Sequence, residues 1–149
     1  MKILLVEDEE KLANALSKGL THEGYATDVI GDGKKALTRI SLHRNDYDLI
    51  ILDPPAFAKR QKDVIPACRG YKDINRIALQ KMPPRSILLT SSCSYYVDES
   101  LFQKVVFQAA VEAGRVTKII GRHELAIDHP INLCHPEGDY LKSLLLYVE

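Results

Sequence analysis

The stretch Tyr47-Asp48-Leu49-Ile50-Ile51-Leu52-Asp53-Pro54-Pro55 organises the rest of the sequence. Its apolar centre, Leu49–Leu52, is the kind of short run that a strand buried on both faces requires. The run ends at a carboxylate and then at a proline pair, and proline ends a strand because it fixes φ and donates no hydrogen bond. The stretch therefore predicts a central strand whose carboxyl end presents Asp53.

Similar apolar runs alternate with helical patterns on both sides of this stretch. Strands are expected at Lys2–Val6, Tyr25–Ile30, Leu49–Leu52, Ser86–Thr90, Val116–Gly121 and Lys142–Val148. Helices are expected after Glu7-Asp8-Glu9-Glu10 and at Lys34–Leu42, Tyr71–Lys81 and Glu99–Ala113. Asp98 would cap the last helix and Gly114 would end it. This alternation implies βαβ units around a mostly parallel sheet, and the last two strands, which lack a helix between them, can pair antiparallel.

The composition is that of an ordinary globular domain. The 149 residues are 46% hydrophobic and 27% charged, with a net charge of zero, and we expect one domain over residues 1–149. No apolar run approaches the ~20 residues of a membrane-spanning helix, and the N-terminus has no signal-peptide layout. The irregular spacing of Cys68, Cys93 and Cys134 argues against a disulfide framework or a zinc site. A reducing cytoplasm is therefore the expected location.

Residues 1–53 resemble a bacterial response-regulator receiver domain of the OmpR and CheY-like kind. The resemblance rests on Ile3-Leu4-Leu5-Val6-Glu7-Asp8-Glu9 and on Asp53 at the end of the third strand. It implies that Glu7, Asp8 and Asp53 could hold Mg²⁺ through oxygen ligands and that Asp53 would be the phosphoacceptor. The alternative for Glu7 and Asp8 is a solvated start of the following helix.

Residues 48–149 resemble the C-terminal half of a class I S-adenosylmethionine-dependent ribosomal-RNA cytosine-C5 methyltransferase. Five sequence words in family order carry this resemblance: Asp53-Pro54-Pro55-Ala56-Phe57-Ala58-Lys59, Arg69-Gly70-Tyr71-Lys72, Thr90-Ser91-Ser92-Cys93-Ser94, Asp128-His129-Pro130 and His135-Pro136-Glu137. It implies that Cys93 is the nucleophile that adds to carbon 6 of cytosine, and that Asp53 handles the proton on N3. The alternative for Cys93 is a small buried thiol.

The same resemblance implies that a group of basic residues faces RNA phosphates. The group comprises Lys59, Arg60, Lys62, Arg69 and Lys72. The alternative is that these side chains form an ordinary solvated face, with no RNA contact.

Each resemblance lacks part of its site. A receiver uses a Lys-Pro pair after the fifth strand, where this chain has Gly121-Arg122-His123, so signal output is not expected. A class I methyltransferase holds S-adenosylmethionine on a glycine-rich turn after the first strand, where this chain has Glu7-Asp8-Glu9-Glu10-Lys11. From these departures we expect no S-adenosylmethionine, at most weak Mg²⁺, and no required partner.

Three hypotheses follow, and the leading one is an engineered chimera without complete catalytic or signalling activity. It joins a receiver-like half, residues 1–53, to a methyltransferase-like half, residues 54–149, and would reside in the cytoplasm of its expression host. The alternatives are a phosphoacceptor signalling domain and a residual RNA cytosine methyltransferase or RNA-binding module. Both parent folds place the first strand beside the strand that ends in Asp53. The expected fold is therefore a three-layer αβα sandwich, a flavodoxin-like and Rossmann hybrid, with strand order 2-1-3-4-6-5 and strand 6 antiparallel.

Overall fold

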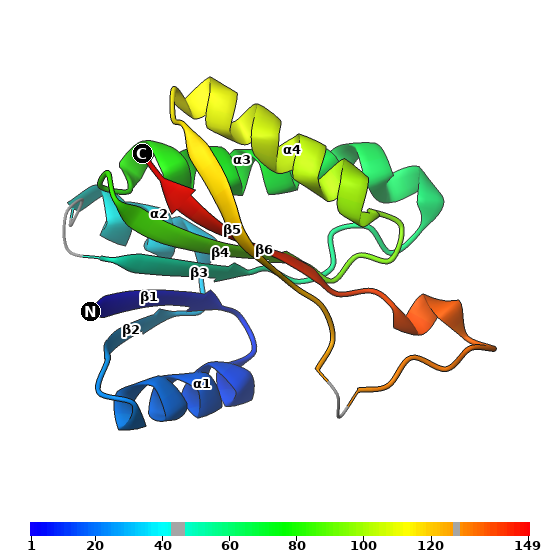
Figure 1. Ribbon diagram of the computed structural model, residues 1–149, viewed down its shortest axis with the longest axis horizontal. Coiled ribbons are helices and arrows are strands. Elements are labelled where there is room, and N and C mark those ends of the chain that lie inside the picture. Colours follow the sequence, from blue (N-terminus) through cyan, green and yellow to red (C-terminus); the bar gives the residue numbers. More distant parts are fainter. Residues whose placement is uncertain (43–46, 127–128) are drawn as a thin grey trace.

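The computed structural model describes residues 1–42, 47–126 and 129–149, and a six-stranded sheet lies at its centre (Figure 1). The strands are β1 (Lys2–Glu7), β2 (Ala26–Ile30), β3 (Leu49–Asp53), β4 (Ser86–Ser92), β5 (Thr117–His123) and β6 (Lys142–Val148). The α-helices within the described residues are α1 (Glu10–His22), α2 (Gly33–Leu42), α3 (Val64–Lys81) and α4 (Glu99–Ala113). Two short 3₁₀ turns, η1 (Gln61–Asp63) and η2 (Pro136–Gly138), complete the elements.

The strand order is β2-β1-β3-β4-β6-β5, which confirms the expected fold class. The pairs β1–β2, β1–β3 and β3–β4 are parallel, whereas β6 runs antiparallel to both of its neighbours, β4 and β5. Pairing of β6 with β4 extends from Ser86 opposite Val148 to Ser92 opposite Lys142. This last pair brings Lys142 to the carboxyl end of β4.

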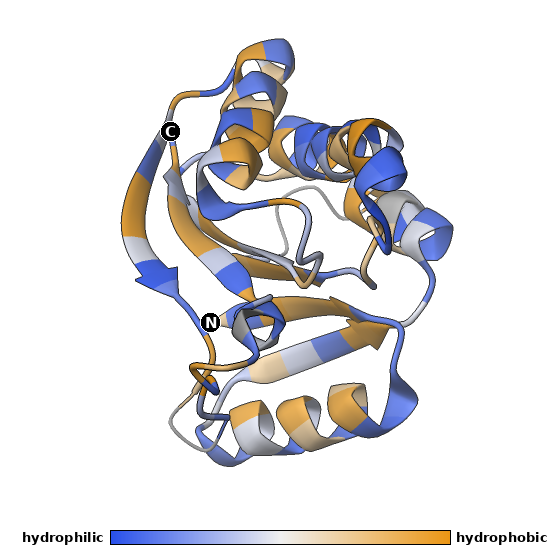
Figure 2. Cartoon of the chain, turned by 90° about the vertical axis from the view of Figure 1, so that its right-hand side faces the viewer, coloured by the Kyte–Doolittle hydropathy of each residue, from blue (hydrophilic) through white to orange (hydrophobic). Residues whose placement is uncertain are grey.

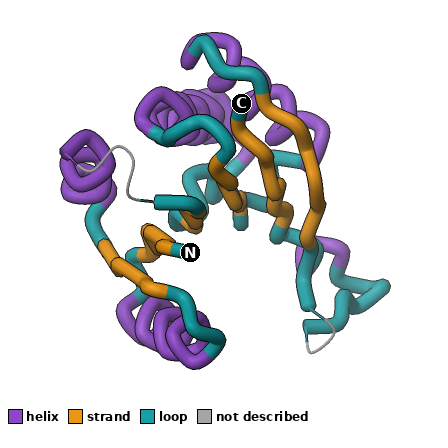
Figure 3. Tube along the Cα trace, turned by 60° about the vertical axis from the view of Figure 1, so that its left-hand side comes forward, coloured by secondary structure: helices purple, strands orange, loops and turns teal. Residues whose placement is uncertain are grey.

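The helices cover the two faces of the sheet unequally. Helix α1 lies alone on one face, against β1 and β2, while α2, α3 and α4 lie on the other (Figures 1 and 3). The larger core lies under these three helices, and Ile50, Leu88 and Phe102 are among its fully buried side chains. Figure 2 shows the matching hydropathy, with apolar segments in the sheet and mixed colouring along the helices.

The observed helix ends follow from local sequence, with one correction. The Asp98 side chain accepts a hydrogen bond from the Leu101 amide at 2.8 Å, and Gly114 ends α4 with a φ of 66°, as expected. Helix α3 begins at Val64 rather than Tyr71. The predicted start at Tyr71 was wrong. Pro66 lies in the first turn of α3, where proline is tolerated because the amides there lack intrahelical partners.

A polar cluster fixes the entry to β3. The Tyr47 hydroxyl donates to the Asp28 carboxylate at 2.6 Å, and the Arg39 guanidinium donates to the same oxygen at 3.2 Å. These bonds join β2, α2 and the residue that precedes β3 by two positions. The Tyr47 hydrogen bond is the largest influence that lowers the pKa of Asp28, and Arg39 and Lys2 act in the same direction.

None of the described helices is long and apolar enough to cross a membrane.

Replacing Asp28 by asparagine should destabilise the fold in a pH-dependent way. The pKa of Asp28 is lower in the folded chain, so its contribution is present above the unfolded pKa and is lost as the pH falls through the folded value. We expect Asp28→Asn to lower the free energy of unfolding by about 1 kcal/mol at pH 7 and to match the parent chain in strong acid. Urea unfolding at several pH values measures this difference. The control Asp73→Asn, which loses only a surface ion pair with Arg76, should change stability by less than about 0.5 kcal/mol.

Candidate active site

Three strands deliver the candidate catalytic residues to one edge of the sheet. Glu7 and Asp53 end β1 and β3 and lie opposite one another in the parallel register. Cys93 follows Ser92, the last residue of β4. Because carboxyl ends of parallel strands meet at one edge, an open α/β sheet binds its ligands there. The Cys93 thiol is half-buried, and its Sγ lies 3.7 Å from the carbonyl oxygen of Pro54.

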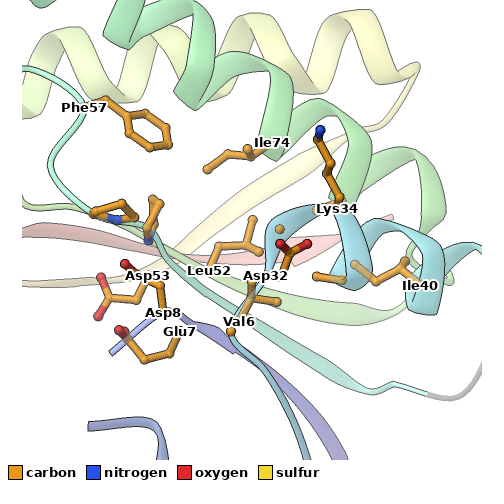
Figure 4. A pocket seen from close by; sticks show the side chains of 16 residues that line it. Val6, Glu7, Asp8, Asp32, Lys34, Ile40, Leu52, Asp53, Phe57 and Ile74 are labelled. Atoms are coloured by element: carbon orange, nitrogen blue, oxygen red, sulfur yellow. The ribbon is translucent and has the colours of Figure 1, made fainter. Parts of the chain in front are cut away.

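A cavity of about 570 Å³ opens beside this edge (Figure 4). The carboxylates of Glu7, Asp8 and Asp53 gather at one end of it, and Asp32 lies apart from them, between Leu52 and Ile40. Apolar side chains form much of the wall, among them Leu52, Ile40 and Ile74. An apolar wall with a few polar groups is the usual construction of a small-molecule site.

The carboxylates at the cavity are poorly compensated. Burial raises the pKa of Asp53, and the nearby charge of Asp8 raises it further. Burial also raises the pKa of Glu7, although the Glu9 amide donates to its Oε1 at 2.7 Å and opposes the rise. Raised carboxyl pKa values mean that this end of the cavity would favour a cationic ligand. Within the described residues, however, no group of three or more His, Cys, Asp or Glu side chains has the arrangement of a metal site.

Asp32 caps a helix and is also exposed at the cavity. Its Oδ1 accepts a hydrogen bond from the Lys35 amide at 2.8 Å, which caps the first turn of α2. The residue is exposed at the rim of the cavity, between Gly31 and Gly33.

A buried hydrogen-bond network connects the turn after β3 to the loop after β4. The Ala58 amide donates to Ser94 Oγ at 3.0 Å, and Ser94 Oγ lies 2.8 Å from the Tyr71 hydroxyl. The Phe57 amide in turn donates to the Tyr71 hydroxyl at 3.4 Å. Ser94 and Tyr71 are both fully buried. The network therefore fixes the position of Cys93 relative to the turn that follows Asp53.

Phe57 links this network to the cavity that it lines. Its ring packs on Tyr71 with a centroid distance of 4.6 Å. Gly70 makes room for the ring, because a Cβ at that position would lie 3.1 Å from Phe57 Cδ2. The motif Arg69-Gly70-Tyr71-Lys72 is therefore explained by the packing of Phe57 against Gly70 as well as by the hydrogen bonds of Tyr71.

Opposing charges act on the Cys93 thiol. Burial raises its pKa most, and the charges of Asp53 and Glu7 raise it further. The ammonium of Lys142, at the start of β6, acts in the opposite direction. Since the thiolate is the reactive form of cysteine, this balance sets how much nucleophile is present.

The predicted RNA-facing residues fall into two groups. Lys59, Arg60, Lys62 and Arg69 are exposed on the segment that leads from the proline turn into α3. Lys72 differs, because its Nζ lies 2.7 Å from the Glu112 carboxylate of α4. Its first role is therefore to join two helices. Asp128, in the fourth family word, lies outside the described residues.

Sequence reasoning missed the residues that support the site. Ser94, Tyr71 and Gly70 were named only as members of the family motifs, without a role of their own. Lys142 was named only as the first residue of a strand. A lysine at the start of an otherwise apolar strand was the available signal for Lys142. The hydroxyl network carried no such signal, because its partners come from three separate segments.

The chain is similar to bacterial methyltransferases over about two thirds of its length. Proteins named ribosomal RNA large subunit methyltransferase I are 52% identical over 100 residues in Tolumonas auensis and 50% identical over 100 residues in Aeromonas salmonicida. Each match covers 67% of this chain and 25% of the relative. The chain thus spans about a quarter of the length of the curated relatives it matches. No protein family model matches it.

Solved structures extend the similarity of fold to nearly the whole chain. A structure titled as a methyltransferase complexed with SAH has a TM-score of 0.68 and 18% identity, covering 97% of this chain and 44% of that one. A methyltransferase homologue from Pyrococcus horikoshii has a TM-score of 0.55 and 19% identity, covering 98% of this chain and 52% of that one. At these identities the similarity concerns the fold.

The comparisons show that the leading sequence hypothesis, an engineered receiver chimera, is wrong. The relatives are bacterial ribosomal-RNA methyltransferases at about 50% identity, and the methyltransferase fold also accommodates residues 1–53. None of the relatives or structures reported above is a receiver. The mistake has a physical origin. Receiver and methyltransferase sheets both place β1 beside the strand ending in Asp53, so an apolar strand followed by acids does not distinguish them.

The expectation that no cofactor binds is also wrong. The relatives are named methyltransferases, and the first of the two structures was solved with SAH. The turn after β1 forms only part of the cavity lining, which also includes residues at the ends of β2 and β3.

Removal of the Tyr71 hydroxyl should weaken the network that positions Cys93. We expect Tyr71→Phe to lower the free energy of unfolding by about 1–2 kcal/mol, because Ser94 Oγ and the Phe57 amide both lose a buried partner. Urea unfolding measures the change. Tyr140→Phe, at an exposed tyrosine, is the control and should stay within about 0.5 kcal/mol of the parent. Equal stability of the two variants would contradict a structural role for the network.

Neutralising Asp53 should stabilise the free chain. Its pKa is raised by folding, so the penalty is absent below the unfolded pKa and grows as the pH rises through the folded one. We expect Asp53→Asn to raise the free energy of unfolding by on the order of 1 kcal/mol at pH 7, and to lose this advantage in strong acid. Thermal unfolding across this pH range tests the sign. A loss of stability at pH 7 would show that Asp53 has a compensating partner.

Proposed function

We propose that this chain forms the S-adenosylmethionine and target-base site of a ribosomal-RNA cytosine-C5 methyltransferase. The observation that carries the proposal is the contact between Cys93 Sγ and the Pro54 carbonyl, at 3.7 Å. It puts a potential nucleophile against the turn whose other side forms the wall of the cavity. A base held at this turn would therefore lie between a thiol and a methyl donor.

The cavity fits the cofactor in charge and in shape. S-adenosylmethionine supplies an electrophilic methyl group on a positively charged sulfonium. The uncompensated carboxylates of Glu7, Asp8 and Asp53 would favour that charge at one end. Apart from these carboxylates, Asp32 would accept hydrogen bonds from the ribose, and the apolar wall with Leu52 and Ile40 would contact the adenine.

The residues of the chain would act on cytosine in a defined order. The Cys93 thiolate forms a bond to carbon 6, and the electron pair of the C5–C6 double bond moves onto carbon 5. Asp53, whose pKa is raised by burial, is suited to donate a proton to N3 as charge develops on the ring. Carbon 5 accepts the methyl group and then loses its proton to water. The C5–C6 double bond re-forms as the Cys93 thiolate leaves, and N3 returns its proton to the Asp53 carboxylate.

The exposed basic segment supports RNA as the substrate class. Lys59, Arg60, Lys62 and Arg69 lie next to the proline turn in the chain and remain exposed, so they could contact phosphates around the target base. The relatives named for a ribosomal-RNA substrate point in the same direction. A protein acting on ribosomal RNA would work in the cytoplasm.

Calorimetry with S-adenosylmethionine tests the cofactor site. We expect saturable binding at one site per chain, and about tenfold weaker binding for Asp32→Asn, because the charge is lost while asparagine still caps α2. Asp98→Asn is a matched control, since Asp98 caps α4 in the same way but does not line the cavity. Absence of binding to the parent chain, or equal affinities for both variants, would overturn the cofactor assignment.

Transfer of a labelled methyl group to ribosomal RNA tests the chemistry separately. Cys93→Ala should abolish transfer while leaving the affinity for S-adenosylmethionine unchanged, because the thiol does not line the cavity. Cys134→Ala, at an exposed thiol away from the site, is the control. Transfer by the Cys93 variant would exclude the thiol as the nucleophile.

A further inference from the structure

Lys142 is a buried cation beside the candidate nucleophile. It is the first residue of β6 and is only 8% exposed, although a lysine is rarely buried to this extent. Its Nζ donates a hydrogen bond to the Ser94 carbonyl oxygen at 2.7 Å. Burying an ammonium is costly, so its retention at this position requires a reason. The methyl-transfer steps described above do not use it.

The hydrogen bond from Lys142 completes the fixation of the Cys93 loop. Ser94 is held through its hydroxyl by the Ala58 amide and Tyr71, and through its carbonyl by Lys142. Ser92 on the other side belongs to β4, where it pairs with Lys142 in the sheet register. Cys93 thus lies between two anchored residues, and both anchors involve Lys142.

The charge of Lys142 also acts on the sulfur. The charged groups that face Cys93 are Asp53 from β3, Glu7 from β1 and Lys142 from β6. Among these charges Lys142 is the one that lowers the pKa of the thiol, and a backbone hydrogen bond at Cys93 lowers it as well. Around Lys142 itself, burial lowers its pKa while Asp139, Cys93 and Asp98 raise it. The two groups therefore stabilise one another's charged forms.

We propose that Lys142 is a positioning residue for Cys93, which anchors the loop through the Ser94 carbonyl and supplies the positive charge that accompanies the thiolate. The role rests on the proposed function to the extent that Cys93 is the nucleophile. Its physical content is nevertheless independent of RNA and of cofactor. Without Lys142, the charged groups that face the thiol would be the carboxylates of Asp53 and Glu7, and both oppose its ionisation.

Alkylation of Cys93 by iodoacetamide tests the proposal on the free, full-length chain. The rate is followed from pH 6 to 10 by peptide mass spectrometry, which separates Cys93 from Cys68 and Cys134. We expect Lys142→Met to shift the profile to higher pH and to slow Cys93 alkylation about fivefold at pH 7.5. Lys142→Arg, which keeps the charge and a donor, should restore the parent profile. The exposed Cys134 is an internal reference whose rate should be equal in all variants.

The shape of the profile separates charge from mere packing. A variant that only loosens the loop would change the plateau rate at high pH without moving the midpoint. An unmoved midpoint in Lys142→Met, or a midpoint moved equally in Lys142→Arg, would overturn the proposal. Should Lys142→Met fail to fold by circular dichroism, Lys142→Gln provides the neutral side chain in its place.

The result is distinguishable from the outcome of the function tests. A shifted alkylation profile together with absent methyl transfer would support Lys142 as the partner of the thiol and overturn the methyltransferase assignment. Methyl transfer with an unshifted profile would do the reverse. Where both hold, the pH–rate profile of methyl transfer by Lys142→Met should move in the same direction as the alkylation profile.

Discussion

The buried junction at Ser94 is the constraint on which the candidate site depends. One serine joins three segments, since its hydroxyl meets the Ala58 amide and the Tyr71 hydroxyl while its carbonyl meets Lys142. The turn after β3, helix α3 and strand β6 are thereby held at fixed positions around Cys93. Each of these hydrogen bonds is buried, where an unpaired polar group is costly. Loss of any one of them would therefore destabilise the junction.

Most of the architecture could be predicted because it depends on local pattern. Apolar runs such as Leu49–Leu52 specify strands, Asp98 and Gly114 specify helix ends, and the lack of a helix before β6 allows an antiparallel strand. The start of α3 was expected at Tyr71, too late in the chain, although Pro66 lies in the first turn of the helix, where proline is tolerated. The extent of β4 through Ser92 was also missed, since small polar residues there suggested a loop. The expectation of a single domain stays a prediction that cooperative unfolding would test.

Only those features of the site that depend on the type of a single residue could be predicted. Asp53 and Cys93 were each expected at the carboxyl end of a strand, where they lie, whereas their environment was not predicted. Their chemical roles stay predictions. The acids after β1 suggested a receiver because they were considered as metal ligands, with a solvated helix start as the alternative. In the folded chain Glu7 is nearly buried and its pKa is raised, which suits a cavity for an organic cation as well. The charge pattern of the sequence therefore left both a metal ion and an organic cation open as ligands. The comparisons with known proteins favoured the methyltransferases over the receivers.

The position of β6 has a consequence for how the chain reaches its native state. Although β6 comes last of the described strands in the sequence, it lies between β4 and β5 within the sheet. Strand β5 has β6 as its partner in the sheet, so it has no ladder to join while β6 is still missing. A ribosome synthesising this chain would release a half-sheet first and its interior strand afterwards. The same late strand carries Lys142 to the thiol. The sheet would then be completed in the same kinetic step that places Lys142 beside Cys93.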